Sequence, residues 1–226
     1  MSDLLEAIEL ETGAHPTASV IWLHGLGADG HDFEAIVPEL DLPPVPIRFV
    51  FPHAPMQSVT INAGMMMRAW YDVSDAAIRL EDEAGVRASQ ARLEALIARE
   101  QKRGSSGNRI LLAGFSQGGA IALHTALRHP ESLAGVMALS CYLPIPERLA
   151  AEVHIANSNI PIFMAHGTED PVVPVSRARE SRELLERQGY TVDWREYRMP
   201  HSVCQEEISD ISDWIRRLVA PQGITR

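Results

Sequence analysis

The sequence predicts an α/β fold with a mostly parallel central sheet and helices on both faces. Short apolar runs rich in β-forming residues alternate with amphipathic stretches along the chain. Most of these runs are apolar at consecutive positions, as is typical of strands that are covered on both faces. Strand–helix alternation of this kind favours a parallel sheet. The 226 residues contain no internal repeat and no low-complexity linker, so we expect a single domain over residues 1–226.

Six runs predict the strands of this sheet, and a seventh predicts an additional edge strand. The six are 19–24 (SVIWLH), 47–52 (IRFVFP), 109–114 (RILLAG), 135–140 (GVMALS), 161–166 (PIFMAH) and 191–197 (TVDWREY), and the edge strand is 5–10 (LEAIEL). Periodic apolar positions predict helices over 85–103, 116–129 and 176–189, and a C-terminal helix with Ile208, Ile211, Ile215 and Leu218 on one face.

Composition and charge narrow the classes of function. The formal net charge is −10, and a field of this sign repels nucleic acid and anionic membranes, so we expect neither as a partner. The two cysteines, Cys141 and Cys204, lack metal-ligand spacing and do not suggest a disulfide framework. The start MSDLLEAIELE does not resemble a signal peptide, and no window reaches the roughly 20 apolar residues of a membrane span. We therefore expect a cytoplasmic protein.

The stretch LLAGFSQGGAIAL (111–123) predicts a nucleophilic serine. Gly114, Ser116 and Gly118 form a G-x-S-x-G pattern between a buried strand and a helix. A tight strand-to-helix turn strains the serine backbone, and the two glycines remove side chains that would clash there. The turn also places the hydroxyl at the carboxyl edge of the sheet and at a helix N-terminus, which favours developing negative charge. The alternative is that Ser116 only caps the helix.

A nucleophilic serine needs a carboxylate to orient its base, and the loop after strand 161–166 carries two acidic residues, Glu169 and Asp170. We favour Asp170. Pro171 fixes the backbone beside it, and its shorter side chain has fewer rotamers to restrict.

The predicted general base is His201. It is the only histidine after the acidic pair and lies in a loop before the last helix, where capping that helix is its alternative role. The other histidines that follow Ser116 are interpreted as core or surface residues: His124, His129, His154 and His166.

Two backbone N–H groups would complete the site by binding the oxyanion of a tetrahedral intermediate. One belongs to Gln117, which follows the serine. The other should come from a glycine-rich loop after an early strand, for which IWLHGLGADG (21–30) is the candidate. A phosphate-binding loop is the alternative, but the lysine of G-x-x-x-x-G-K-[ST] is missing.

The segments LHGLGADG, AGFSQGGA, HGTEDPVVP and HSV together resemble the carboxylesterase/phospholipase family, which includes small bacterial carboxylesterases and eukaryotic acyl-protein thioesterases. FPHAP, INAGMMMRAWYD and ALSCYLP are similar to further family segments, so the likeness covers nearly the whole chain. The resemblance implies an α/β-hydrolase fold, a triad of Ser116, Asp170 and His201, and oxyanion N–H groups from Leu26 and Gln117. The segment VTINAGMMMRAWYD looks closest to the bacterial carboxylesterases. One departure is Pro200, since family members often have glycine before the histidine.

We therefore expect a serine carboxylesterase whose substrates are small-molecule esters of short to medium acyl chains. The reaction would pass through an acyl-enzyme on Ser116 and would need no metal or organic cofactor. An acyl-protein thioesterase or lysophospholipase is the first alternative, because it would share every catalytic residue. A non-catalytic binding protein on the same fold is the second. The resemblance also implies that a homodimer is a possible assembly.

Apolar side chains beside the serine would bind the acyl chain. The methionine-rich run 64–70 (GMMMRAW) is a candidate wall, because its three methionines can adapt to varied chains, and it ends in Trp70. Leu143 and Val173 are the further candidates. A plain core role is an equal alternative for each of them. The interval from Cys141 to Ile160 has the length of an ordinary crossover, so we expect no lid domain.

Overall fold

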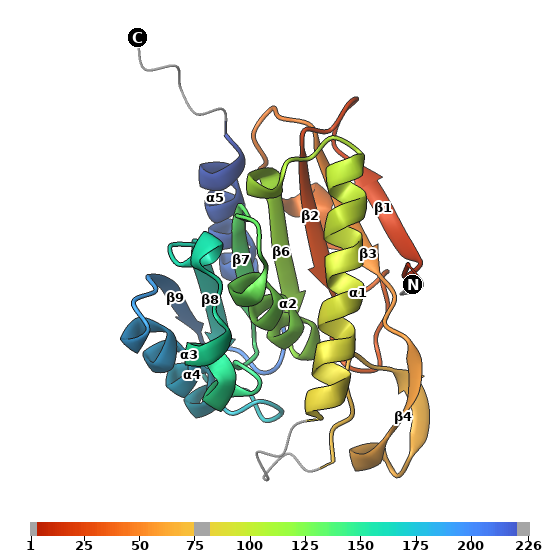
Figure 1. Cartoon of the computed structure of the whole chain (residues 1–226), viewed down its shortest axis with the longest axis vertical. Coiled ribbons are helices and arrows are strands. Elements are labelled where there is room, and N and C mark those ends of the chain that lie inside the picture. Colours follow the sequence, from red (N-terminus) through yellow and green to blue (C-terminus); the bar gives the residue numbers. More distant parts are fainter. Residues whose placement is uncertain (1–3, 75–81, 221–226) are drawn as a thin grey trace.

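The central sheet of the computed structural model has seven strands in the order β1-β3-β2-β6-β7-β8-β9 (Figure 1). The structure describes residues 4–74 and 82–220. Every strand of this sheet coincides with a run that the sequence predicts. The strands are β1 (Ala7–Glu11), β2 (Ala18–Leu23), β3 (Ile47–Pro52), β6 (Ile110–Phe115), β7 (Gly135–Leu139), β8 (Ile162–Gly167) and β9 (Val192–Tyr197).

The strands of the sheet are parallel except at one edge. β1 pairs antiparallel with β3, and every other neighbouring pair is parallel. β2, β3, β6, β7 and β8 are buried along nearly their whole length, because helices cover both faces. This confirms the predicted fold, an α/β-hydrolase fold with a mostly parallel sheet.

Two buried clusters hold the helices against the sheet. The helices are α1 (Glu83–Lys102), α2 (Gln117–Arg128), α3 (Leu149–Glu152), α4 (Val175–Arg187) and α5 (Gln205–Val219). Apolar side chains of α1 to α4 form the cluster on one face of the sheet. Side chains of α5 and of the 3-10 helix η1 (Glu34–Glu39) form the cluster on the other face, and Figure 1 shows α1 and α5 on opposite sides.

A small hairpin between β3 and α1 was not predicted. β4 (Met56–Val59) and β5 (Met65–Arg68) pair antiparallel and extend from the body of the molecule (Figure 1). Met65 is 63% exposed and Met66 is 58% exposed. The run of methionines expected to help form an acyl wall therefore places two of its side chains in solvent.

The connection between β7 and β8 is short. It contains the 3-10 helix η4 (Pro146–Arg148), the four-residue α3 and the 3-10 helix η5 (Ile155–Asn157). In this connection, all of which the structure describes, no helix has the length of a lid. The other long connection includes residues 75–81, which lie outside the described residues. No helix in the described ranges is both long and apolar enough to cross a bilayer.

Candidate active site

Ser116 alone forms the turn between β6 and α2. Its φ of 54° and ψ of −122° are strained for a residue with a side chain. A Cβ atom on Gly114 would lie 2.4 Å from the carbonyl of Gly118, and one on Gly118 would lie 2.4 Å from the carbonyl oxygen of Leu23. The two glycines therefore let the helix, the turn and the neighbouring strand come together. The Ser116 side chain makes no cap hydrogen bond to α2, so the structure does not support the capping alternative.

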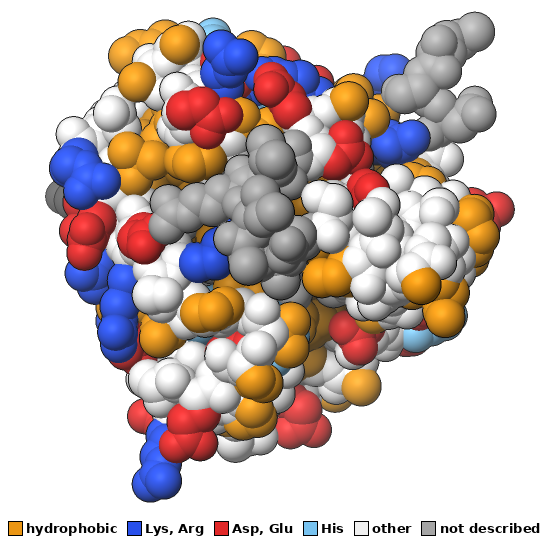
Figure 2. All heavy atoms as spheres, turned by 90° about the horizontal axis from the view of Figure 1, so that it is seen from below, with side chains coloured by type: hydrophobic (Ala, Val, Ile, Leu, Met, Phe, Trp, Pro, Cys, Tyr) orange, Lys and Arg blue, Asp and Glu red, His pale blue; other side chains and the backbone are white. Residues whose placement is uncertain are grey.

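Three side chains from the carboxyl ends of different strands form one row of hydrogen bonds. Nε2 of His201 lies 2.9 Å from Oγ of Ser116, and Nδ1 of His201 lies 2.6 Å from Oδ2 of Asp170. These residues follow β9, β6 and β8 in turn. Figure 2 shows the molecule from this end of the sheet, where hydrophobic side chains lie among acidic and basic ones. Because the carboxylate accepts the proton on Nδ1, Nε2 is free to accept one from the serine hydroxyl.

The structure places Asp170, and not Glu169, beside the histidine. The Asp170 side chain is fully buried, and its Oδ1 accepts hydrogen bonds from the backbone N–H groups of Val172 and Val173 at 2.8 and 2.9 Å. Glu169 is 56% exposed and pairs with Arg198 at 2.8 Å. The carboxylate of Asp170 is therefore held in one orientation from both of its oxygens.

The loop that carries His201 packs closely on the end of β8 although Pro200 stands in it. A Cβ atom on Gly167 would lie 2.3 Å from the carbonyl oxygen of Met199 and 2.5 Å from that of Pro200. The ring of Phe115 supports the imidazole of His201 at a centroid distance of 4.7 Å. Pro200 is thus compatible with the approach of His201 to Ser116, and Cys204, not His201, is the N-cap residue of α5.

Sequence reasoning missed a second histidine at this site. His166 is fully buried, and its Nε2 lies 2.8 Å from the carbonyl oxygen of Val173 and 3.4 Å from Oδ2 of Asp170. Burial lowers the pKa of His166, so the ring is neutral near pH 7. In one sequence, a histidine near the end of a buried strand is not distinguished from any other core histidine. His124 is buried on α2, His129 is buried directly after that helix, and His154 accepts a backbone N–H of η5.

The glycine-rich loop after β2 lies directly against the serine. A Cβ atom on Gly25 would be 3.5 Å from Cβ of Ser116. Among the described residues, no acceptor is hydrogen-bonded to the backbone N–H of Leu26 or of Gln117. Two N–H groups beside a serine hydroxyl can stabilise an anion that forms on an attacked carbonyl oxygen.

Other kinds of site fit the same loop less well. Residues 25–30 do match the G-x-G-x-x-G spacing of dinucleotide-binding loops. In such a site the loop leads directly into a helix whose N-terminus binds the phosphates, whereas here a turn and the six-residue η1 follow. Within residues 4–74 and 82–220, no three His, Cys, Asp or Glu side chains gather as a metal site would require.

Trp70 connects three parts of the site and exposes almost no surface. It is 1% exposed. Its Nε1–H donates to the carbonyl oxygen of His24 at 2.9 Å, and its backbone N–H donates to Oε1 of Gln117 at 2.7 Å. Its own carbonyl oxygen accepts the hydroxyl of Ser89 on α1. Trp70 thus joins the loop after β2, the start of α2 and α1.

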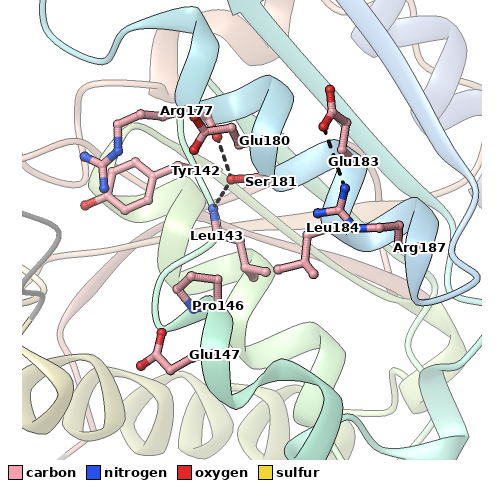
Figure 3. Close-up of a pocket in the computed structure, with 10 residues that line it drawn as sticks. All are labelled: Tyr142, Leu143, Pro146, Glu147, Arg177, Glu180, Ser181, Glu183, Leu184 and Arg187. Carbon is pink, nitrogen blue, oxygen red and sulfur yellow. Dashed lines mark hydrogen bonds and ion pairs between the residues drawn. The ribbon is translucent and has the colours of Figure 1, made fainter.

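Leu143 and Val173 are both buried, and only Leu143 lines a described pocket. Leu143 lines a pocket of about 410 Å³ between the segment after β7 and α4. In Figure 3 its side chain points toward that of Leu184, and its backbone N–H donates to Ser181 at 2.9 Å. Neither Val173 nor Trp70 lines this pocket. The acyl-binding role of these three residues stays a prediction.

Comparisons with known proteins agree with this geometry. Residues 6–219 match the model of the phospholipase/carboxylesterase family. The chain is 41% identical to acyl-protein thioesterase 1 of Neurospora crassa over 217 residues, which cover 89% of this chain and 87% of that protein. It is 38% identical to acyl-protein thioesterase 1 of Yarrowia lipolytica over 216 residues, which cover 92% and 95%.

Solved structures give the same result. The crystal structure of acyl-protein thioesterase 2 of Zea mays superposes with a TM-score of 0.82 at 26% identity, covering 95% of this chain and 100% of that one. The segment VTINAGMMMRAWYD favoured the bacterial carboxylesterases, whereas these relatives, which match most of the chain, are named acyl-protein thioesterases. Together with the family match over 6–219, these relationships mean that the chain belongs to the phospholipase/carboxylesterase family and is a serine hydrolase that acts on ester bonds.

Proposed function

We propose that this protein is an acyl-protein thioesterase that releases fatty acyl groups from thioesters through an acyl-enzyme on Ser116. The row of hydrogen bonds from Asp170 through His201 to Ser116 carries the proposal of covalent catalysis. The choice of a thioester rests on relatives named acyl-protein thioesterase 1 that are about 40% identical over most of the chain.

The proposed reaction has two halves. Oγ of Ser116 attacks the acyl carbonyl carbon while Nε2 of His201 takes the hydroxyl proton, and the N–H groups of Leu26 and Gln117 stabilise the oxyanion. The C–S bond then breaks, and the thiol leaves with the proton from His201. In the second half, water gives a proton to His201 and attacks the acyl carbonyl carbon of the acyl-enzyme. The bond from that carbon to Oγ of Ser116 then breaks, and His201 returns the proton to Oγ, which releases the fatty acid and restores Ser116. Asp170 holds the imidazole throughout.

A second candidate function is a carboxylesterase for oxygen esters of short to medium acyl chains. The observation in its favour is the short connection between β7 and β8, which carries only η4, α3 and η5. Enzymes without a lid in this connection do not need a lipid surface to expose the serine. The two candidates share the same residues and differ in the leaving group.

A matched pair of substrates separates the candidates. One peptide carries an octanoyl group on a cysteine sulfur, and the other carries it on a serine oxygen at the same position. A thioesterase should give the larger kcat/KM on the thioester after the rates are divided by those of hydroxide-catalysed hydrolysis. A larger normalised value on the oxygen ester would replace the thioesterase with the carboxylesterase.

The role of Ser116 has its own controls. Ser116→Ala should lower kcat by about 10⁴- to 10⁶-fold, whereas Ser209→Ala, at an exposed position of α5, should leave it unchanged. A fluorophosphonate probe should label the wild-type protein at Ser116. No labelling would favour the non-catalytic binding protein, and labelling at another residue would show that the nucleophile is not Ser116.

Two further proposals concern where the protein is located in the cell and how it assembles. We propose a cytoplasmic location, which Cys141 and Cys204 support because both are free thiols. We also propose a homodimer, in line with the family resemblance. Fractionation of cells and sedimentation velocity of the purified protein test these two points.

A further inference from the structure

A buried histidine in the loop after β2 makes two hydrogen bonds to the backbone. His24 is 2% exposed. Its Nδ1 lies 2.7 Å from the carbonyl oxygen of Gly25, and its Nε2 lies 3.0 Å from the backbone nitrogen of Ala54, just after β3. Within the described residues, the hydrogen bonds and ring contact of the His24 side chain go to Gly25, Ala54 and Trp70 and not to Ser116, His201 or Asp170. Catalysis as proposed above therefore leaves His24 without a role.

The partners of His24 fix its tautomer. The backbone N–H of Ala54 can only donate, so Nε2 of His24 must accept and therefore carries no proton. The proton lies on Nδ1 and points to the carbonyl oxygen of Gly25. Burial lowers the pKa of the ring to about 4, so the imidazole stays neutral and keeps this tautomer near pH 7.

The bond from His24 acts on the peptide unit that carries a predicted oxyanion donor. The carbonyl of Gly25 and the N–H of Leu26 belong to one planar trans peptide, in which the two groups point in opposite directions. Holding the carbonyl toward the buried ring of His24 therefore turns the N–H away from it. We infer that His24 is a positioning residue that aims the Leu26 N–H at the oxyanion, an inference that rests on the proposed covalent mechanism.

The peptides on both sides of this unit are also held. The carbonyl oxygen of His24 accepts the indole N–H of Trp70 at 2.9 Å, and the N–H of Gly27 donates to the carbonyl oxygen of Arg68 at 2.9 Å. The carbonyl of Gly25 has one further donor, the N–H of Ala28, at the longer distance of 3.3 Å. The bond from His24 is thus the shorter of the two that set the direction of this carbonyl.

Two substitutions of His24 separate its two hydrogen bonds. In His24→Asn, the side-chain amide replaces Nδ1 and can still donate to the carbonyl of Gly25, but the N–H of Ala54 loses its acceptor. In His24→Gln, the side-chain amide replaces Nε2 and can still accept from Ala54, but the donor to Gly25 is lost. Each variant loses one bond and keeps the other.

The inference predicts opposite orders of activity and stability. His24→Gln should lower kcat by about 10- to 100-fold relative to His24→Asn, with KM changed little, because loss of an oxyanion donor costs about 10²- to 10³-fold and a misdirected donor costs less. His24→Asn should be the less stable variant in chemical unfolding, because it leaves a buried N–H without an acceptor. A trifluoromethyl ketone, which forms a tetrahedral adduct with the serine, should lose affinity in parallel with kcat.

Each contrary result is informative. If kcat follows stability, so that His24→Gln is the more active variant, or if the two variants are equally active, His24 has only a structural role and the inference is wrong. The wild-type protein and Ser116→Ala are measured alongside them. If Ser116→Ala retains wild-type activity, the covalent mechanism itself fails, and that outcome is distinct from a failure of the inference about His24.

Discussion

The imidazole of His166 lies beside the carboxylate of Asp170, with Nε2 of the histidine 3.4 Å from Oδ2 of the aspartate. The same Nε2 lies 2.8 Å from the carbonyl oxygen of Val173. Oδ2 is also the atom that faces His201. The carbonyl oxygen of Val173 can only accept, so Nε2 of the neutral His166 ring carries the proton and donates this hydrogen bond. The bond fixes the turn that carries the carboxylate of Asp170.

This contact predicts different effects for two substitutions of His166. His166→Gln keeps an N–H near the position of Nε2, and its kcat should stay within about 3-fold of the wild-type value. His166→Leu keeps the bulk but loses the donor, and its kcat should fall by about 10-fold or more, in proportion to a lost buried hydrogen bond. Steady-state kinetics of both variants check this, and equal values would contradict it.

The neighbouring acidic residues should differ sharply in their contribution to catalysis. Asp170→Asn leaves no carboxylate to hold the proton on Nδ1 of His201, so kcat should fall by about 10³- to 10⁴-fold. Glu169→Gln removes only an exposed pair with Arg198 and should change kcat less than 2-fold. A larger loss at Glu169 would show that the acid has been assigned to the wrong residue.

The close contact at Gly118 predicts a loss of both stability and activity when a methyl group is added. In Gly118→Ala the new Cβ would lie 2.4 Å from the carbonyl oxygen of Leu23, and overpacking of this kind costs about 1 to 3 kcal/mol. Gly13→Ala is the matched control, because its Cβ would meet only the ring of Pro46 at 3.3 Å. Urea unfolding and ester hydrolysis of both variants test the prediction. Equal effects of the two substitutions would mean that the turn after β6 tolerates a methyl group at position 118.

A buried carboxyl group on α5 makes stability depend on pH. Glu207 is fully buried, and burial raises its pKa to about 8 from an ordinary value of 4.5, while the backbone N–H of Cys204 opposes the shift and Asp210 adds to it. Between these two values the folded state binds more protons than the unfolded state. The free energy of unfolding therefore falls as the pH rises from 4.5 through about 8.

Glu207→Gln should remove this dependence, because the amide resembles the protonated acid and does not ionise. At about pH 9 the variant should be more stable than the wild-type protein, by a free energy of unfolding on the order of 2 to 4 kcal/mol, and at about pH 5 the two should be nearly equal. Glu206→Gln, at the exposed neighbouring position, should show no such gain. A variant that is less stable at the higher pH would show that the ionised carboxylate has a partner.

The parts of this structure that the sequence predicted are those set by burial. Strands β2, β6 and β7 are apolar at consecutive positions because both faces are covered, so their pattern does not depend on distant contacts. The G-x-S-x-G turn could also be predicted from the sequence. Backbone atoms close in sequence or on a neighbouring strand leave no room for a side chain at Gly114 and Gly118.

The features that were missed depend on pairing across the chain. The hairpin of β4 and β5 has exposed methionines, which give no alternating pattern. The hydrogen bonds of Trp70 to His24 and Gln117 were not predicted, because they join residues far apart in sequence. The same holds for His166, whose neighbour Asp170 becomes a partner only through the turn at Val173. Side-chain chemistry alone does not contain this information.

The order of the strands has a consequence for how the protein can lose activity. Ser116 follows β6, which has a strand on each side, whereas His201 follows β9, which is at the edge and pairs only with β8. Most residues of β9 are only partly covered, and such edges open in local fluctuations that cost less free energy than global unfolding. Amide protons of β9 should therefore exchange with solvent before those of β6. Opening of β9 would move His201 away from Ser116 while the turn after β6 stays intact. The enzyme can therefore lose activity while most of its sheet remains folded.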